Sequence, residues 1–72
     1  MKLVWKRMYL GSYHGYSDEG RQVAQIGHVI GPDGESEGWL VYLVHHLGEL
    51  PGRYPTEEAA QTAAETTLDQ YA

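Results

Sequence analysis

The stretch that most constrains the fold runs from Gly38 to His45 and is the longest apolar run in the chain. It is short for a helix, and it is rich in the β-branched and aromatic residues that favour strands. Both alternating sets of its side chains are apolar. We therefore predict a central strand that is covered on both faces, and we expect the rest of the chain to supply that cover.

Two further strands are predicted ahead of this one. Residues 5–16 alternate loosely, and Gly11 indicates a bend or bulge within a single first strand. Residues 21–30 alternate more regularly and predict a second strand. The turn-forming segments 17–20 and 31–38 separate the three strands, and the second of them contains Pro-Asp-Gly. Sequential strands with short connections predict an antiparallel meander.

One helix is predicted, from Glu57 to about Tyr71. Thr56 suits its N-cap, and the prolines and glycines of residues 47–55 argue against regular structure before it. One face of this helix is built mainly from small residues, namely Ala60, Ala63, Ala64, Thr67, Leu68 and Tyr71. Such a helix can lie close to a sheet whose bulk comes from Trp39, Val41 and Leu43, with Ala24 and Ile26 alongside.

The predicted fold class is therefore α+β. A three-stranded antiparallel sheet carries one C-terminal α-helix on one face, in a single βββα domain that spans residues 1–72. A chain of this length supports only a small core.

Charge is distributed unevenly along the chain, whose formal net charge is −5. Three of the five cations lie in the first seven residues, namely Lys2, Lys6 and Arg7. The rest of the chain contains all ten acids and only two cations, Arg21 and Arg53. An acidic body repels phosphate, so nucleic acid is not the expected partner. It is suited to a basic protein partner.

Several classes of protein are not expected from the sequence. The chain has no cysteine, which excludes disulfides and cysteine-based zinc sites. Its first residues lack the apolar segment of a signal peptide, and no window is apolar enough for a membrane helix. We expect a cytoplasmic protein that does not bind membranes.

Four histidines, His14, His28, His45 and His46, are many for 72 residues. Neighbouring strands could bring some of them together, but the spacings typical of zinc sites are absent from the sequence. We predict no metal site and no cofactor, and we keep a histidine-based metal- or pH-responsive module as an alternative. The chain has no phosphate-binding glycine loop and no nucleophile motif, so we do not expect an enzyme.

The candidate partner-binding residues are acids and tyrosines. Glu58, Glu65 and Asp69 lie opposite the small face of the helix, where we expect them to be solvated. The loop acids Asp33, Glu35 and Glu37 are expected to add a second acidic patch. Tyrosines supply large contact areas at protein interfaces, and we include three of them, Tyr9, Tyr13 and Tyr42.

The second half of the chain carries the pattern Gly38-Trp39-x-Val41, followed by Gly52-x-Tyr54-Pro55-Thr56-x-Glu58-Ala59-Ala60. With the strand–strand–strand–helix order, this pattern resembles the small βββα domains of phage genomes over residues 21–70. It is similar to the arm-type DNA-binding domain of phage tyrosine integrases, which implies a nucleic-acid-binding module as a second alternative. Those domains have a basic sheet, whereas this chain is acidic, so no DNA-contacting residue is transferred.

In size, acidity and lack of cysteine, the chain also resembles small phage inhibitors of host defence proteins, including anti-CRISPR proteins. This resemblance implies a protein-binding inhibitor that occupies a basic nucleic-acid-binding site on a protein of a bacterial host. Homodimerisation through the edge of the first strand is left open.

Overall fold

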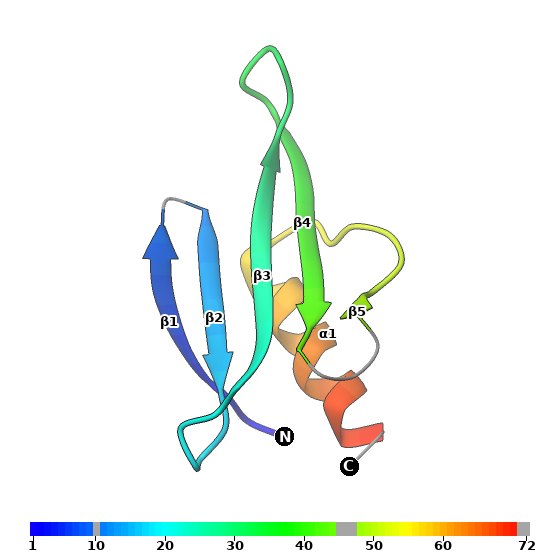
Figure 1. Ribbon diagram of the computed structural model, residues 1–72. Helices are drawn as coiled ribbons and strands as arrows, with labels where there is room; N and C mark the ends of the chain where they lie inside the picture. The colour runs from blue at the N-terminus through cyan, green and yellow to red at the C-terminus, as the bar shows by residue number, and fades with distance from the viewer. Residues whose placement is uncertain (10, 45–47, 71–72) are drawn as a thin grey trace.

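The computed structural model describes residues 1–9, 11–44 and 48–70 (Figure 1). Its elements are β1 (Val4–Tyr9), β2 (Ser12–Tyr16), β3 (Gln22–Ile30), β4 (Ser36–Leu43), β5 (Gly48–Glu49) and α1 (Glu57–Gln70). The strands pair in chain order as one antiparallel sheet, and α1 covers one face of β3 and β4. The predicted α+β class and C-terminal helix are confirmed, but the sheet has five strands instead of three.

The first difference lies at Gly11, where the expected bend within one strand is a hairpin between β1 and β2. Lys6 is paired with His14 across this hairpin, and Tyr9 with Ser12. Gly11 has a φ of 75°, a conformation that side chains with a Cβ rarely adopt. A Cβ there would also lie 3.1 Å from the Cβ of His28, so the residue suits both the turn and the close approach of β3.

The second difference is β5, which lies within the segment expected to be irregular. Gly48 pairs with Leu43, and Glu49 pairs with Tyr42, so the chain folds back on β4. Gly48 has a φ of 72°, which permits the reversal, and Pro51 follows after the two-residue strand has ended.

The core lies between the helix and the Trp39-bearing side of β4. Ile26, Val41 and Leu43 are the largest fully buried side chains. They pack with small helix residues, as predicted from the sequence. The buried hydrophobic residues of the described segments are Leu3, Ala24, Ile26, Val41, Leu43, Leu50, Ala60, Ala64 and Leu68. The predicted register of β4 is confirmed, because Ala24 and Ile26 pair with Leu43 and Val41.

The prediction that β4 is covered on both faces is wrong. Tyr42 is 48% exposed on the face away from the helix, and Leu40 is half-buried there. None of the described elements covers this second face, which we call the open face and which is turned toward the viewer in Figure 1. A single helix packed on one face leaves the other face uncovered, and no other described element follows it.

The N-terminus of α1 is the predicted one. The Thr56 hydroxyl oxygen accepts a hydrogen bond of 3.1 Å from the backbone N–H of Ala59, which is the geometry of an N-cap.

Three residues named in the sequence analysis, Tyr71, His45 and His46, lie outside the described residues. Among the described helices, none has the length and apolarity needed to span a membrane.

Candidate functional site

Two of the three predicted helix acids contact the N-terminal segment, and Asp69 remains exposed, as expected, while doing so. The Glu65 carboxylate is half-buried and accepts hydrogen bonds from the backbone N–H of Leu3 at 2.9 Å and from Trp5 Nε1 at 3.2 Å. Asp69 pairs with the α-amino group of Met1. The expectation of a solvated stripe is therefore wrong for Glu65, because the segment that enters β1 covers this side of the helix. Glu58 is exposed, as expected.

Two of the predicted loop acids, Asp33 and Glu35, lie at the tip of the β3–β4 hairpin, which projects beyond the other strands (Figure 1). Glu37 lies just below the tip, in β4 and not in the loop. Asp33, Glu35 and Glu37 are all exposed. Glu37 pairs with Arg53 at 3.1 Å, whereas the described residues place no cation within ion-pair distance of Asp33 or Glu35.

Backbone hydrogen bonds hold this tip in one shape. The N–H of Gly31 donates to the carbonyl of Glu35 at 2.8 Å, and the N–H of Gly34 donates to the carbonyl of Gly31 at 3.0 Å. Gly34 has a φ of 84°, which suits the turn. The carboxylates are thus presented from an ordered turn.

The opposite end of the sheet is more balanced in charge. The β2–β3 turn carries Asp18 and Glu19, and both line a hollow of about 340 Å³ together with Lys2. Arg21 is exposed directly after the turn. Acid therefore predominates at the hairpin tip and not at this end.

The open face carries a row of polar side chains that crosses all five strands. The pairing places them side by side in the order Lys6, His14, Gln25, Tyr42 and Glu49. The cation and the acid therefore stand at opposite edges of the sheet. A neighbouring row contains Tyr9, Ser12, Gly27 and Leu40.

The open face is hollowed at Gly27. A Cβ added to this glycine would meet no atom within 4 Å, so the missing side chain leaves a gap on the surface. The hollow has a volume of about 410 Å³ and is lined by Gln25, Gly27, Leu40, Val41, Tyr42 and Glu49. Lys6, Gln25, Gly27 and Glu49 are absent from the sequence prediction of the site. If the sequence prediction had placed a hairpin at Gly11 in place of a bulge, it would have placed Lys6 opposite His14, as the structure does.

The three predicted tyrosines lie on different faces. Tyr9 and Tyr42 are 77% and 48% exposed and share the open face. Tyr13 lies on the helix side, with its ring centroid 6.2 Å from that of Trp39. The neighbouring Glu57 carboxylate, acting as a hydrogen-bond acceptor and as a charge, raises the pKa of Tyr13 above its ordinary value. Tyr13 is therefore engaged within the fold.

The two described histidines lie on opposite faces of the sheet. His14 is on the open face, whereas His28 stacks on Trp39 with ring centroids 4.5 Å apart and an interplanar angle of 11°. The His28 Nε2 atom also lies 2.8 Å from the Ser36 hydroxyl. These two imidazoles cannot ligate one ion together, and the described part of the chain contains no cluster of three potential metal ligands.

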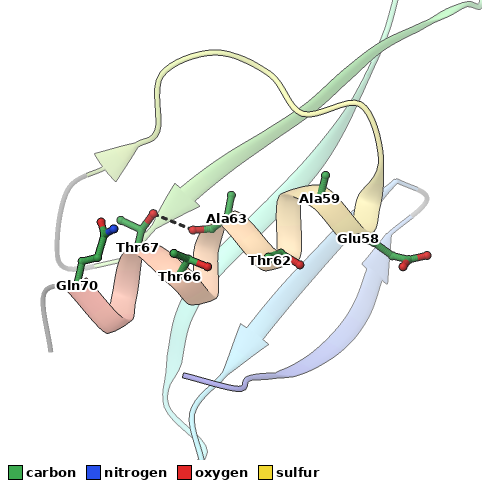
Figure 2. A pocket seen from close by; sticks show the side chains of 7 residues that line it. All are labelled: Glu58, Ala59, Thr62, Ala63, Thr66, Thr67 and Gln70. Atoms are coloured by element: carbon green, nitrogen blue, oxygen red, sulfur yellow. Dashed lines mark hydrogen bonds between the residues drawn. The ribbon is translucent and has the colours of Figure 1, made fainter.

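The outer surface of α1 forms a third hollow, of about 500 Å³ (Figure 2). Small or polar side chains line it, namely Glu58, Ala59, Thr62, Ala63, Thr66, Thr67 and Gln70. The Thr67 hydroxyl donates to the carbonyl of Ala63 at 2.7 Å and is thereby satisfied within the helix. Among the described residues, Glu58 is the only titratable side chain that lines this hollow, so these residues offer no pair of groups for acid–base chemistry.

The comparisons with known proteins find no matching family model, no matching curated protein and no matching solved structure.

Proposed function

We propose that this chain is a small acidic protein-binding module that places the tip of its β3–β4 hairpin on a basic site of another protein. The observation that carries the proposal is the position of two exposed carboxylates, Asp33 and Glu35, on the turn that projects farthest from the sheet (Figure 1). Glu37 follows just below the turn, in β4, where it pairs with Arg53. A projecting turn can enter a concave site that a flat surface cannot reach.

The stem of the hairpin adds apolar contact area beside these charges. Ile30 is 54% exposed and pairs with Ser36 at the base of the turn. An exposed apolar side chain flanked by carboxylates suits a basic cleft, because burial supplies affinity while the charges supply orientation and a fast approach.

The kind of partner follows from the negative sign of these charges and from their position on a projecting hairpin. Basic clefts with several converging cations are typical of sites that hold nucleic-acid phosphates. The hairpin tip offers carboxylates in place of phosphates, so it would compete with nucleic acid for such a site. The resemblance to small acidic phage inhibitors of host defence proteins is in keeping with this role, and we extend the proposal to inhibition of a host protein of that kind.

The proposal is tested with the immobilised protein and a bacterial lysate. The tip variant carries Asp33→Asn and Glu35→Gln, which leaves the Glu37–Arg53 pair intact. The matched control carries Asp18→Asn and Glu19→Gln on the other turn, with the same change of charge. We expect a basic protein, identified by mass spectrometry, that binds the wild type and the control but not the tip variant, and whose binding weakens as salt is raised.

A second arm tests the site on the partner. Single- or double-stranded nucleic acid added to the complex should displace the wild-type protein from the captured partner. Equal loss of binding in both variants would indicate non-specific charge attraction and would overturn the proposal. Retention of binding by the tip variant would overturn it as well.

A further inference from the structure

We propose that the open face binds a second copy of the chain, face to face, about a two-fold axis that runs parallel to the strands. This inference goes beyond the proposed function because it uses a different surface from the hairpin tip. It rests on the order of side chains across the sheet and on the exposed apolar groups beside them.

The row on the open face begins with a cation and ends with an acid. Lys6 is on β1 and Glu49 is on β5, and three strands lie between them. Four strand spacings of about 4.8 Å separate the two residues by about 19 Å. They are therefore too far apart to pair within one chain, and Lys6 instead has its Nζ atom 5.3 Å from the centre of the Tyr16 ring.

A two-fold axis parallel to the strands reverses the order of this row. The axis passes over β3, the middle strand of the sheet, so Lys6 of each copy then faces Glu49 of the other, and His14 faces Tyr42. An axis perpendicular to the strands in the same plane would instead bring Lys6 against Lys6. Packed sheets lie about 10 Å apart, a gap that lysine and glutamate side chains can bridge together. The charges of the open face therefore select one isologous arrangement.

Apolar groups on the same face supply the area to be buried. Tyr9, Tyr42 and Val4 are exposed, with relative exposures of 77%, 48% and 54%, and Leu40 is half-buried. The hollow at Gly27 gives room for a side chain of the second copy. Aromatic side chains around a hollow, with charges at the rim, are the usual composition of a protein interface.

The face is better suited to self-association than the edge of β1. In an antiparallel pairing of two β1 strands, Lys6 and Arg7 of one copy would lie against the same cations of the other. Cations on an edge strand oppose such pairing.

In the face-to-face arrangement the two hairpin tips point the same way, because the two-fold axis is parallel to the strands.

The test measures the molar mass of the purified protein over a range of concentrations, by sedimentation equilibrium. We expect a dimer whose dissociation constant rises by about ten-fold in Lys6→Glu and in Glu49→Lys, since each change makes two facing pairs repulsive. The double variant, Lys6→Glu with Glu49→Lys, should restore the wild-type constant. Because the two residues are far apart within one chain, such a rescue requires contact between copies.

Three further variants keep the test decisive. Gly27→Glu places a side chain in the hollow, where its Cβ would meet no atom of the chain within 4 Å, and should abolish the dimer, while circular dichroism shows that the fold is retained. The control variants Arg21→Glu and Glu58→Lys lie away from the row on the open face and should leave the dimer unchanged.

A protein that stays monomeric up to millimolar concentration would overturn the inference. So would a dimer that is indifferent to both charge reversals, or one that the double variant fails to restore. The hairpin-tip variant should dimerise normally, so failure of this inference is distinguishable from failure of the proposed function.

Discussion

The indole nitrogen of Trp5 donates a hydrogen bond of 3.2 Å to the carboxylate of Glu65, which lies 60 residues further along the chain. The same carboxylate accepts the backbone N–H of Leu3 at 2.9 Å. We call this contact of Leu3, Trp5 and Glu65 the clasp. It joins the first strand to the helix, although α1 packs mainly on β3 and β4.

The clasp predicts a loss of stability on removal of its carboxylate. Glu65→Ala leaves two donors without their charged acceptor in a half-buried site, so we expect the free energy of unfolding to fall by about 1–3 kcal/mol. The measurement is urea unfolding followed by tryptophan fluorescence. Glu58→Ala, on the exposed side of the same helix, is the matched control and should change stability by less than about 0.5 kcal/mol. Equal losses in the two variants would contradict the assignment of Glu65 to the clasp.

A pair of glycines in the sheet predicts opposite responses to the same substitution. A Cβ at Gly15 would lie 2.9 Å from the ring of Trp5 and 3.1 Å from the side chain of Leu3. We expect Gly15→Ala to lower stability by about 1–2 kcal/mol, because the indole must shift away from the new methyl group.

Gly27→Ala is the control for that substitution, since its Cβ enters open space. It should leave stability unchanged or raise it by about 0.5 kcal/mol, because alanine restricts the unfolded chain. Thermal unfolding of the two variants in parallel shows whether stability falls in Gly15→Ala and stays constant or rises in Gly27→Ala. A stable Gly15→Ala protein would show that Trp5 is not packed over this glycine.

The N-cap of the helix predicts that two substitutions of Thr56 lower the stability of the protein to different extents. Its hydroxyl oxygen accepts the N–H of Ala59 at 3.1 Å, and alanine cannot replace that acceptor. We expect Thr56→Ala to lower the free energy of unfolding by about 1 kcal/mol and Thr56→Ser to retain most of it. Denaturant midpoints for the two variants provide the measurement. A serine variant as unstable as the alanine variant would contradict the N-cap role.

Alkaline titration predicts that Tyr13 ionises later than an ordinary tyrosine. The Glu57 carboxylate raises the pKa of Tyr13 above its ordinary value, chiefly as a hydrogen-bond acceptor, with a smaller opposing effect from Arg7. The folded state then holds this proton more tightly than the unfolded state. The stabilisation is therefore complete below the ordinary pKa and is lost as the pH rises toward the raised value.

The measurement is tyrosinate absorbance, with the Tyr13→Phe protein subtracted. Glu57→Gln should bring the pKa of Tyr13 down toward its ordinary value, because both the charge and the strong acceptor are removed. Glu58→Gln is the matched control and should leave the titration of Tyr13 unchanged. An unaltered titration in the Glu57 variant would contradict the contact.

The central strand and the helix could be predicted from sequence because their signals are local. Because the facing side of α1 is mostly alanine, the large side chains of the core must come from the sheet. This reasoning predicted that Val41 and Leu43 lie on the core side, beside Ile26 and Ala24. The N-cap at Thr56 likewise depends on residues within one helical turn.

The remaining elements depend on contacts between distant segments. Gly11 carries the same sequence signal whether it forms a bulge or a hairpin, so alternation on both sides suggested one strand. The two residues of β5 are visible only once β4 is in place beside them. The helix wheel gave the direction of Glu65 but not the approach of Leu3 and Trp5, and so it missed the clasp.

The order of the sheet has a kinetic consequence. Every strand pairs with its neighbour in the sequence, so the hairpins can form one after another with short loop closures. The clasp spans almost the whole chain and can close only after the helix has docked. We therefore expect its loss to speed unfolding while the rate of folding stays nearly constant, which would make this single carboxylate a determinant of how long each folded molecule persists.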